Sequence, residues 1–424
     1  MGDPRSPGGS GTTPEDAMSA LRGFVVACLL APPVAAQTGV WSAPVPLTEV
    51  NTPTNDYYPF LSADGVTLRW SSARTDLPGG PGAWDIYQAV RPDRFSPFGP
   101  VTREPGGINT SSNDLGVHVM PSEMQAFHTI VTGNSDLWET TRSGPAGPWG
   151  TPVLVLPLAA SGTDYGVTVT ADGLYMMFSS GRPGGAGGQD LYESHFVSGM
   201  WTPPVLVAPL STSGGEYGPC LAPDGLTVWY SGAPSGSGDQ NVMVSRRKLT
   251  TDPWGAPVPV PELNSTSYER EPHVSDDGRE IFFTSGRPGS LGAPDNWTAR
   301  WTGLTHQNLP QPTRPFLIHL SIPSLPGANY QIGLSLSSTP GFPVPGVGTI
   351  PLGLDPLLLL SISGVLPSVF QNFSGVLDSN GWATATLNIP PGPLVHLDFS
   401  IAAVTYGPGG VSFITNGEDL KVNP

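Results

Sequence analysis

Charged residues are scarce in this chain of 424 residues. Asp, Glu, Lys and Arg together make up 12% of it, about half of the usual share. The 18 basic residues form no run longer than Arg246-Arg247-Lys248, and the 34 acidic residues leave a net charge of −16. Because binding to nucleic acid needs concentrated positive charge, we expect no nucleic-acid partner.

Long apolar runs are also missing. The main candidate, residues 21–36, is too short to cross a bilayer, which takes about 20 apolar residues. Arg22, near its start, is the only nearby positive charge, and it ends in Val34-Ala35-Ala36, which is typical of a secretory signal peptide with cleavage after Ala36. We therefore predict a signal peptide over residues 1–36, with Met18 as an alternative start, no transmembrane segment, and a secreted or periplasmic protein.

Cysteine is nearly absent, since the chain contains only Cys28 and Cys220. Removal of the signal peptide would leave Cys220 alone, and no intramolecular disulfide could form. In the alternative interpretation, Val25-Val26-Ala27-Cys28 is a lipoprotein signal in which Cys28 carries the lipid.

Glycine and proline, by contrast, are abundant, with 54 and 50 residues. They punctuate a unit of about 50 residues that occurs five times and is rich in strand and turn signals. Each unit has a Trp-x-x-Pro-Val segment or a variant of it, an acidic residue beside an aromatic, an apolar strand, a Gly-rich loop and a further Asp. The five opening acidic residues are Asp56, Asp114, Asp164, Glu216 and Glu269, and the later ones are Asp85, Asp136, Asp190, Asp239 and Asp295.

This period predicts an all-β chain whose residues 37–305 form a five-bladed β-propeller, with six blades as the alternative. The Trp41 segment precedes unit one, whereas Trp301 after unit five is not followed by Pro-Val. We therefore expect the N-terminal strand to complete the last blade. A linker at 306–315 and a small C-terminal β-sandwich at 316–424 follow, with one of its strands predicted at Leu357–Ile362.

Two of the units resemble the TolB-like propeller repeat. The resemblance rests on Pro219 to Asp224-Gly225, on Pro272 to Asp277-Gly278, and on Phe283-x-Ser285-x-Arg287. It covers roughly Trp41 to Leu304. Such repeats occur in binding proteins, in partner-docking periplasmic proteins and in protease accessory domains, so the resemblance implies the fold but no particular function.

The candidate ligand-binding residues are the opening carboxylates Asp56, Asp114, Asp164, Glu216 and Glu269. If they precede the innermost strand of each blade, they ring one mouth of the central channel, where they could bind Ca²⁺ or a polyhydroxyl ligand. The alternative is that each carboxylate caps a turn of its own blade. The later Asp residues are expected to bind loop N–H groups or the arginine of the blade.

Function is expected where the repeat breaks. His118 and His273 share one register, and unit five adds Arg270 and Glu271 to its opening carboxylate. We predict an exported, non-catalytic propeller that binds a polysaccharide or a protein. The alternative is a glycosidase-like enzyme that uses Asp56, Asp114, Asp164 and Glu216. No cofactor is expected apart from calcium.

Overall fold

The computed structural model describes residues 39–78, 80–233, 240–292, 294–307, 310–344, 348–391, 397–407 and 410–422. The predicted signal peptide and Asp239 lie outside these residues. The chain divides into two compact units, one formed by Trp41–Trp301 and the other containing Thr302 onward. It passes from one to the other within β22. In the part of the chain that is described, no helix is long and apolar enough to span a membrane.

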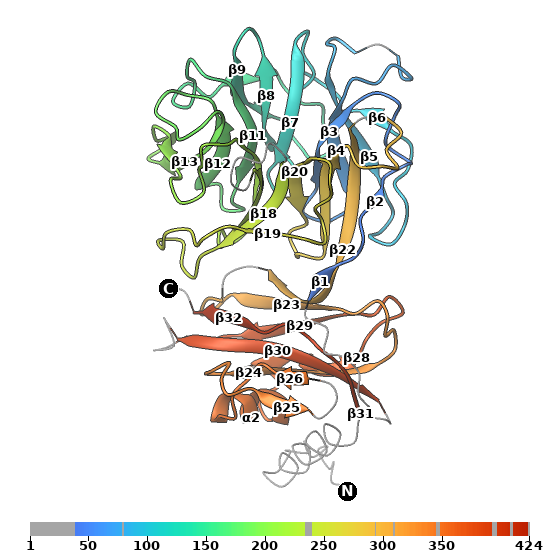
Figure 1. Cartoon of the computed structure of the whole chain (residues 1–424), viewed down its shortest axis with the longest axis vertical. Helices are drawn as coiled ribbons and strands as arrows, with labels where there is room; N and C mark the ends of the chain where they lie inside the picture. Colours follow the sequence, from blue (N-terminus) through green and yellow to red (C-terminus); the bar gives the residue numbers. More distant parts are fainter. Residues whose placement is uncertain are drawn as a thin grey trace, which may run out of the picture. The chain divides into compact units, whose positions relative to one another are not determined.

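The first unit is a propeller-type arrangement of small antiparallel sheets, as predicted (Figure 1). Five sheets have four main strands each, of which the inner three follow in sequence order from the channel outward. The innermost strands contact one another in a closed ring, in which β20 meets β3. These strands are β3 (Asp56–Leu61), β7 (Asn113–Val119), β11 (Asp164–Val169), β16 (Glu216–Leu221) and β20 (Glu269–Val274).

The second, third and outermost strands follow in each sheet. The second strands are β4 (Thr67–Ser72), β8 (Gln125–Val131), β12 (Tyr175–Ser180), β17 (Thr227–Gly232) and β21 (Glu280–Ser285). The third are β5 (Asp85–Val90), β9 (Ser135–Thr141), β13 (Asp190–Val197), β18 (Asn241–Arg246) and β22 (Asp295–Gln307). The outermost are β6 (Thr102–Arg103), β10 (Val153–Leu154), β15 (Val205–Leu206), β19 (Val258–Pro259) and β2 (Val45–Pro46), and β1 (Val40–Trp41) and β14 (Met200–Trp201) add short pairings.

The fifth sheet is closed by the N-terminal strand, as expected from the missing Pro-Val after Trp301. In β2, Val45 pairs with Thr298 and Pro46 with Trp297 of β22. The ring of Trp41 packs edge-on against that of Trp301, with centroids 5.2 Å apart. The apolar core of this unit is divided into clusters between neighbouring sheets, where Trp41, Trp149, Trp201 and Trp254 are buried.

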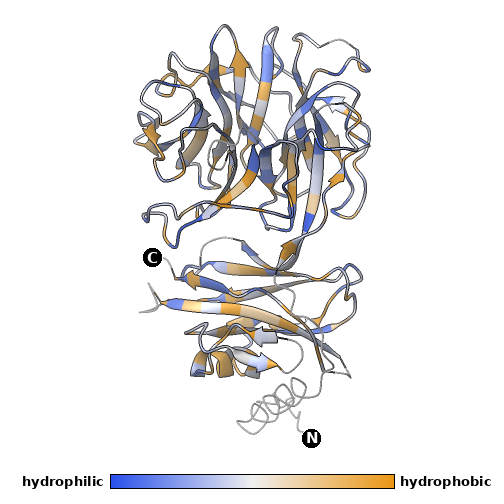
Figure 2. Ribbon diagram, viewed as in Figure 1, coloured by the Kyte–Doolittle hydropathy of each residue, from blue (hydrophilic) through white to orange (hydrophobic). Residues whose placement is uncertain are grey.

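The C-terminal unit contains two antiparallel sheets that share one core. One sheet joins the end of β22 to β23 (Pro315–Ser321), β29 (Trp382–Asn388) and β27 (Phe370–Gln371). The other contains β28 (Ser374–Val376), β24 (Asn329–Ser335), β30 (Asp398–Gly407), β31 (Gly410–Ile414) and β32 (Glu418–Lys421), and a hairpin is made of β25 (Phe342–Val344) and β26 (Gly348–Ile350). Apolar side chains of both sheets, such as Phe316, Ile332 and Ile401, meet in the core. Figure 2 shows such apolar residues along the strands of both units.

The strand predicted at Leu357–Ile362 is wrong, because these residues form helix α2 (Pro356–Ser363). The Asp355 side chain caps its first turn and accepts hydrogen bonds from the N–H groups of Leu357 and Leu358. Pro356 begins the helix, and Gly364 ends it with a φ of 69°. An Asp-Pro start and a left-handed Gly end are strong helix signals, and they outweigh the apolar run between them.

Candidate functional site

Each opening carboxylate is the first or second residue of its innermost strand, and all five are buried. In four sheets the carboxylate accepts a hydrogen bond from the backbone N–H of the residue four positions earlier. The N···O distances are 2.8 Å from Thr52 to Asp56, 2.6 Å from Thr110 to Asp114, 3.0 Å from Thr212 to Glu216 and 3.0 Å from Ser265 to Glu269. These side chains therefore cap the loop that leads into their own strand.

The other contacts of the five carboxylates are also internal. Arg182 lies 3.1 Å from Asp164, and Arg287 lies 2.9 Å from Glu269. The indole N–H of Trp70 donates to Asp56. Burial raises the pKa of Asp56, Asp164 and Glu216. This geometry favours the capping alternative, and ligand binding by these five residues stays a prediction.

Calcium likewise stays a prediction. Among the described residues no group of three or more His, Cys, Asp or Glu side chains is arranged to hold a metal ion. Thermal melting with and without millimolar calcium tests it directly.

Asp114 differs from the other opening carboxylates. Its partner across the ladder is Ile130, where Asp56, Asp164 and Glu269 face a serine. In the described part of the chain no arginine pairs with Asp114, and the nearest ring nitrogen of buried His128 is 3.9 Å away. Burial therefore raises the pKa of Asp114 to about 7 and lowers that of His128 to about 3.

Two of the later Asp residues, Asp190 and Asp295, bind loop N–H groups, as predicted for them. Asp190 accepts from Gly187 N at 3.1 Å, and Asp295 accepts from Leu291 N and Gly292 N. The other interpretation, in which these residues pair with the arginine of the blade, is wrong for two sheets. Arg182 and Arg287 pair with the opening carboxylates Asp164 and Glu269 instead.

Each innermost strand contains a β-bulge that begins just after the residue following its opening carboxylate. The residue at the bulge, two positions after the opening carboxylate, has a left-handed backbone in every sheet. In three sheets it is Gly, and a Cβ on Gly218 would lie 2.6 Å from the Cα of Glu271. In the other two it is Tyr58, with φ 57°, and Glu271, with φ 47°. Non-Gly residues in this region are strained, and such strain is concentrated at functional sites.

Two residues further along, five side chains plug the channel: Phe60, His118, Thr168, Cys220 and His273. Three of them bond to the backbone of the next sheet, through Thr168 Oγ1 to Leu221 N at 3.1 Å, Cys220 Sγ to Val274 N at 3.3 Å and His273 Nε2 to Leu61 O at 3.1 Å.

The shared register of His118 and His273 is a real spatial relation, since both rings contact Phe60, with centroids 5.1 and 4.5 Å from it. Burial lowers the pKa of His118 to about 3 and that of His273 to about 4. Both rings are therefore neutral.

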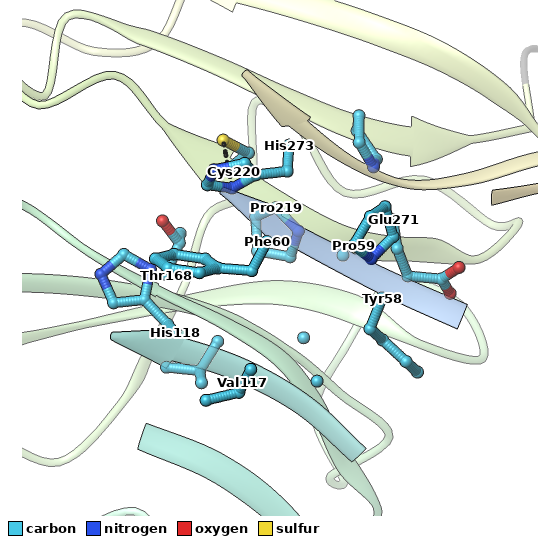
Figure 3. Close-up of a pocket in the computed structure, with 15 residues that line it drawn as sticks. Tyr58, Pro59, Phe60, Val117, His118, Thr168, Pro219, Cys220, Glu271 and His273 are labelled. Carbon is cyan, nitrogen blue, oxygen red and sulfur yellow. Dashed lines mark hydrogen bonds between the residues drawn. The ribbon is translucent and has the colours of Figure 1, made fainter. Parts of the chain in front are cut away.

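A cavity of about 40 Å³ lies in the channel next to this plug. It has room for a few water molecules. Three consecutive residues of every innermost strand line it, from Tyr58–Phe60 of β3 to Glu271–His273 of β20. Figure 3 shows the plug on one side and the side chains of Tyr58 and Glu271 pointing away from it.

Of the described residues that line this cavity, Glu271 is the only carboxylate. It is buried, and its Oε2 has no hydrogen-bond partner among the residues that the structure describes. Burial raises the pKa of Glu271 to about 7, although Arg270 opposes the shift. A carboxyl with this pKa can donate or accept a proton near neutral pH.

Partly exposed side chains surround Tyr58 and Glu271. The ring of Tyr57 lies 6.2 Å from that of Tyr58, and its hydroxyl lies close enough to Tyr268 for the two to interact. The guanidinium of Arg270 lies 5.1 Å from the ring of Tyr268. We call Tyr57, Tyr58, Tyr268, Arg270 and Glu271 together the tyrosine mouth.

Sequence reasoning identified part of this site. It singled out Arg270 and Glu271 as additions in unit five, but it missed Tyr58. The signal was present, because aligning the five opening carboxylates places Gly116, Gly166 and Gly218 in the register of Tyr58 and Glu271. A position that is Gly in three repeats and bulky in two indicates a backbone constraint that function overrides.

No protein-family profile matches the chain, and no curated protein sequence matches it. Solved structures that are similar include the catalytic domain of a GH62 alpha-L-arabinofuranosidase from Coprinopsis cinerea, with 12% identity and a TM-score of 0.40 over 63% of this chain and 98% of that one. TolB from Acinetobacter baumannii has 15% identity and a TM-score of 0.35, over 58% of this chain and 54% of that one. A GH43_1 enzyme from Xanthomonas citri has 11% identity and a TM-score of 0.38, over 61% of this chain and 91% of that one. These distant likenesses assign neither a family nor an activity.

Proposed function

We propose that this protein is an exported carbohydrate-binding propeller whose tyrosine mouth holds a polyhydroxylated ligand. In this proposal the first unit is a five-bladed propeller, and the C-terminal unit is a small β-sandwich. The observation that carries the proposal is the left-handed backbone of Tyr58 and Glu271, where three other sheets have glycine.

The chemistry of the mouth supports a sugar ligand. Tyrosine rings offer flat apolar area together with a hydroxyl, so they can lie against the C–H face of a sugar ring and bond to its hydroxyl groups. The Oε2 atom of Glu271, which has no partner among the described residues, and the partly exposed Arg270 add polar groups that can fix the ligand's orientation. The cavity below is too small for a sugar, so the ligand would lie at the mouth.

A glycosidase-like activity is the second candidate, and one observation favours it. The pKa of Glu271, raised to about 7 by burial, suits a general acid. Hydrolysis by paired carboxyl groups needs a second one on the other side of the scissile bond. Asp56, Asp114 and Glu216 are engaged as loop caps and Asp164 pairs with Arg182, which makes binding without hydrolysis the first proposal.

A glycan panel and a set of aryl glycosides test both candidates with the purified chain. We expect binding to at least one polysaccharide class, which Tyr58→Gly abolishes without lowering the melting temperature, because glycine accepts the left-handed backbone. Ser198→Gly is the matched control. Ser198 also has a positive φ, 52°, but it lies in the turn between β13 and β14, and we expect this variant to bind normally.

Binding to no glycan would refute the proposal. If the chain instead binds a protein partner, and Tyr58→Gly abolishes that binding, the tyrosine mouth is a protein-interaction site. Release of the aryl group by the parent chain, lost in Glu271→Gln, would establish the second candidate.

A further inference from the structure

Arg270 occupies a position where the other sheets have apolar or aromatic residues. The residues in its register, one after the opening carboxylate, are Tyr57, Leu115, Tyr165 and Tyr217. The Arg270 guanidinium lies 5.4 Å from the ring of Tyr217 and 5.1 Å from that of Tyr268, and its Nε donates to the Gln240 side chain. It is therefore held between two aromatic rings in a fixed orientation.

This guanidinium has no carboxylate within ion-pair distance among the described residues, unlike Arg182 and Arg287, which follow the second strands of the third and fifth sheets. Both of those arginines form ion pairs with opening carboxylates. Arg270 is only partly buried, so its terminal N–H groups remain accessible. A guanidinium that is stacked, oriented and without a carboxylate suits a planar anion, which it can bind through two parallel hydrogen bonds.

The surroundings of Arg270 do not cancel its charge. The opening carboxylates are buried and bonded within their own sheets, and Asp76 is paired with Arg74 at 2.8 Å. Glu271 is the nearest carboxyl in the mouth, and burial raises its pKa to about 7, so at and below neutral pH a large share of it is uncharged. Among the described residues, the charge of Arg270 therefore has no paired carboxylate, in a chain whose net charge is −16.

We propose, building on the carbohydrate-binding function above, that the tyrosine mouth recognises sugars that carry a carboxylate. The ligand's carboxylate binds the Arg270 guanidinium, while a sugar ring of the uronate type lies on Tyr268 and Tyr58. No bond is made or broken in this step, since it is recognition alone. Glu271 bonds to a sugar hydroxyl beside it.

The test compares a tetramer of galacturonate with its fully methyl-esterified counterpart, which keeps the sugar chain but replaces each carboxylate by an uncharged ester. Binding is measured by calorimetry at pH 6.5 and about 0.15 M salt, where the Debye length of about 8 Å screens the repulsion from the chain's net charge. We expect the parent chain to prefer the acid by about tenfold or more, which corresponds to about 1.4 kcal/mol. Tetramers of mannuronate and guluronate, run alongside, show which uronate fits.

Arg270→Gln should remove most of this preference, because glutamine keeps polar atoms but not the charge. Arg270→Lys should keep part of it, since an ammonium attracts a carboxylate without the bidentate geometry. Arg103→Gln is the matched control for net charge. Arg103 is bonded to Pro78 O at 2.7 Å and lies outside the mouth, so its variant should keep the full preference.

Three results overturn the inference: equal affinity of the parent chain for acid and ester, a preference that survives Arg270→Gln, or a preference that Arg103→Gln removes equally. If neutral glycans bind at the mouth and no uronate is preferred, the inference fails while the carbohydrate-binding function stands. If neither ligand nor any other glycan binds, both fail. A melting temperature for each variant assigns a loss of binding to the mouth rather than to unfolding.

Discussion

Asp114 and Glu269 hold the same position in their repeats, yet the residues around them give them different properties. Glu269 accepts hydrogen bonds from Ser265 and Ser285 and pairs with Arg287. Asp114 lacks both the second serine and the arginine, and burial raises its pKa to about 7. The register of these residues could be predicted from the sequence. Their burial could not, because it depends on neighbouring sheets that are distant in the chain.

Glu269→Ala is expected to lower the free energy of unfolding by about 3–5 kcal/mol, because it leaves the Arg287 guanidinium buried without its carboxylate. Urea denaturation of the parent and the variant measures this. Adding Arg287→Met to Glu269→Ala should recover part of the loss, since the uncompensated charge is gone. A single-variant loss below about 1 kcal/mol would show that the pair contributes little.

Asp114 predicts a pH dependence of stability. Its folded pKa of about 7 lies above its ordinary value of 3.8, so between these values the folded state binds more protons than the unfolded state. Stability from this group is therefore full below about pH 4 and is lost as the pH rises through 7. We expect Asp114→Asn to flatten the fall in unfolding free energy between pH 5 and 7, as measured by urea denaturation at several pH values.

The control for this experiment is Asp93→Asn. Hydrogen bonds from Phe95 N and Ser96 lower the pKa of exposed Asp93, so it titrates below this pH range. An unchanged slope in Asp114→Asn, or an equal flattening in Asp93→Asn, would contradict the assignment.

At the scale of elements, repeat periodicity predicted the strands of the propeller and their order, because each sheet uses the same local signals. The sequence also predicted that the N-terminal strand completes the fifth sheet. Helix α2 was predicted as a strand, since an apolar run of this length fits either element. The capping residues Asp355 and Gly364 distinguish the helix from a strand. Giving these capping signals more weight than the apolar run would have predicted the helix.

The cap of α2 gives a prediction at this scale. Asp355→Ala should lower the stability of the C-terminal unit by about 2 kcal/mol, near the upper end for N-caps, since this carboxylate also accepts from Ser335 Oγ and Leu336 N. Asp355→Asn, which keeps a capping oxygen, should lose clearly less. Thermal and urea melts of the full chain check both, and equal losses would mean that the charge of Asp355 matters more than its role as a cap.

At the scale of the whole propeller unit, the ring is closed between the first and fifth sheets by contacts of several kinds. Strand β2 pairs with β22, and Asn51 exchanges hydrogen bonds with the backbone of Asn296. Arg91 of the first sheet forms a buried ion pair with Glu280 of the fifth, 2.6 Å apart. The sequence pattern indicated that the N-terminal strand closes the fifth sheet but not this ion pair, because Arg91 directly follows β5 and Glu280 begins β21, far apart in the chain.

Removing the N-terminal strands should therefore open the ring. A chain that begins at Leu47 loses the β2–β22 pairing and the buried Trp41 ring, whose removal alone is expected to cost about 3–5 kcal/mol. It also exposes the edge of β22, which can then pair with other chains. Compared with a chain that begins at Gln37, we expect a much lower midpoint of urea unfolding, followed by tryptophan fluorescence, and a tendency to aggregate. Trp41→Ala in the longer chain should give an intermediate midpoint. If both shortened and longer chains unfold at the same urea concentration, the Asn51 and Arg91–Glu280 contacts suffice to close the ring and the N-terminal strand is dispensable.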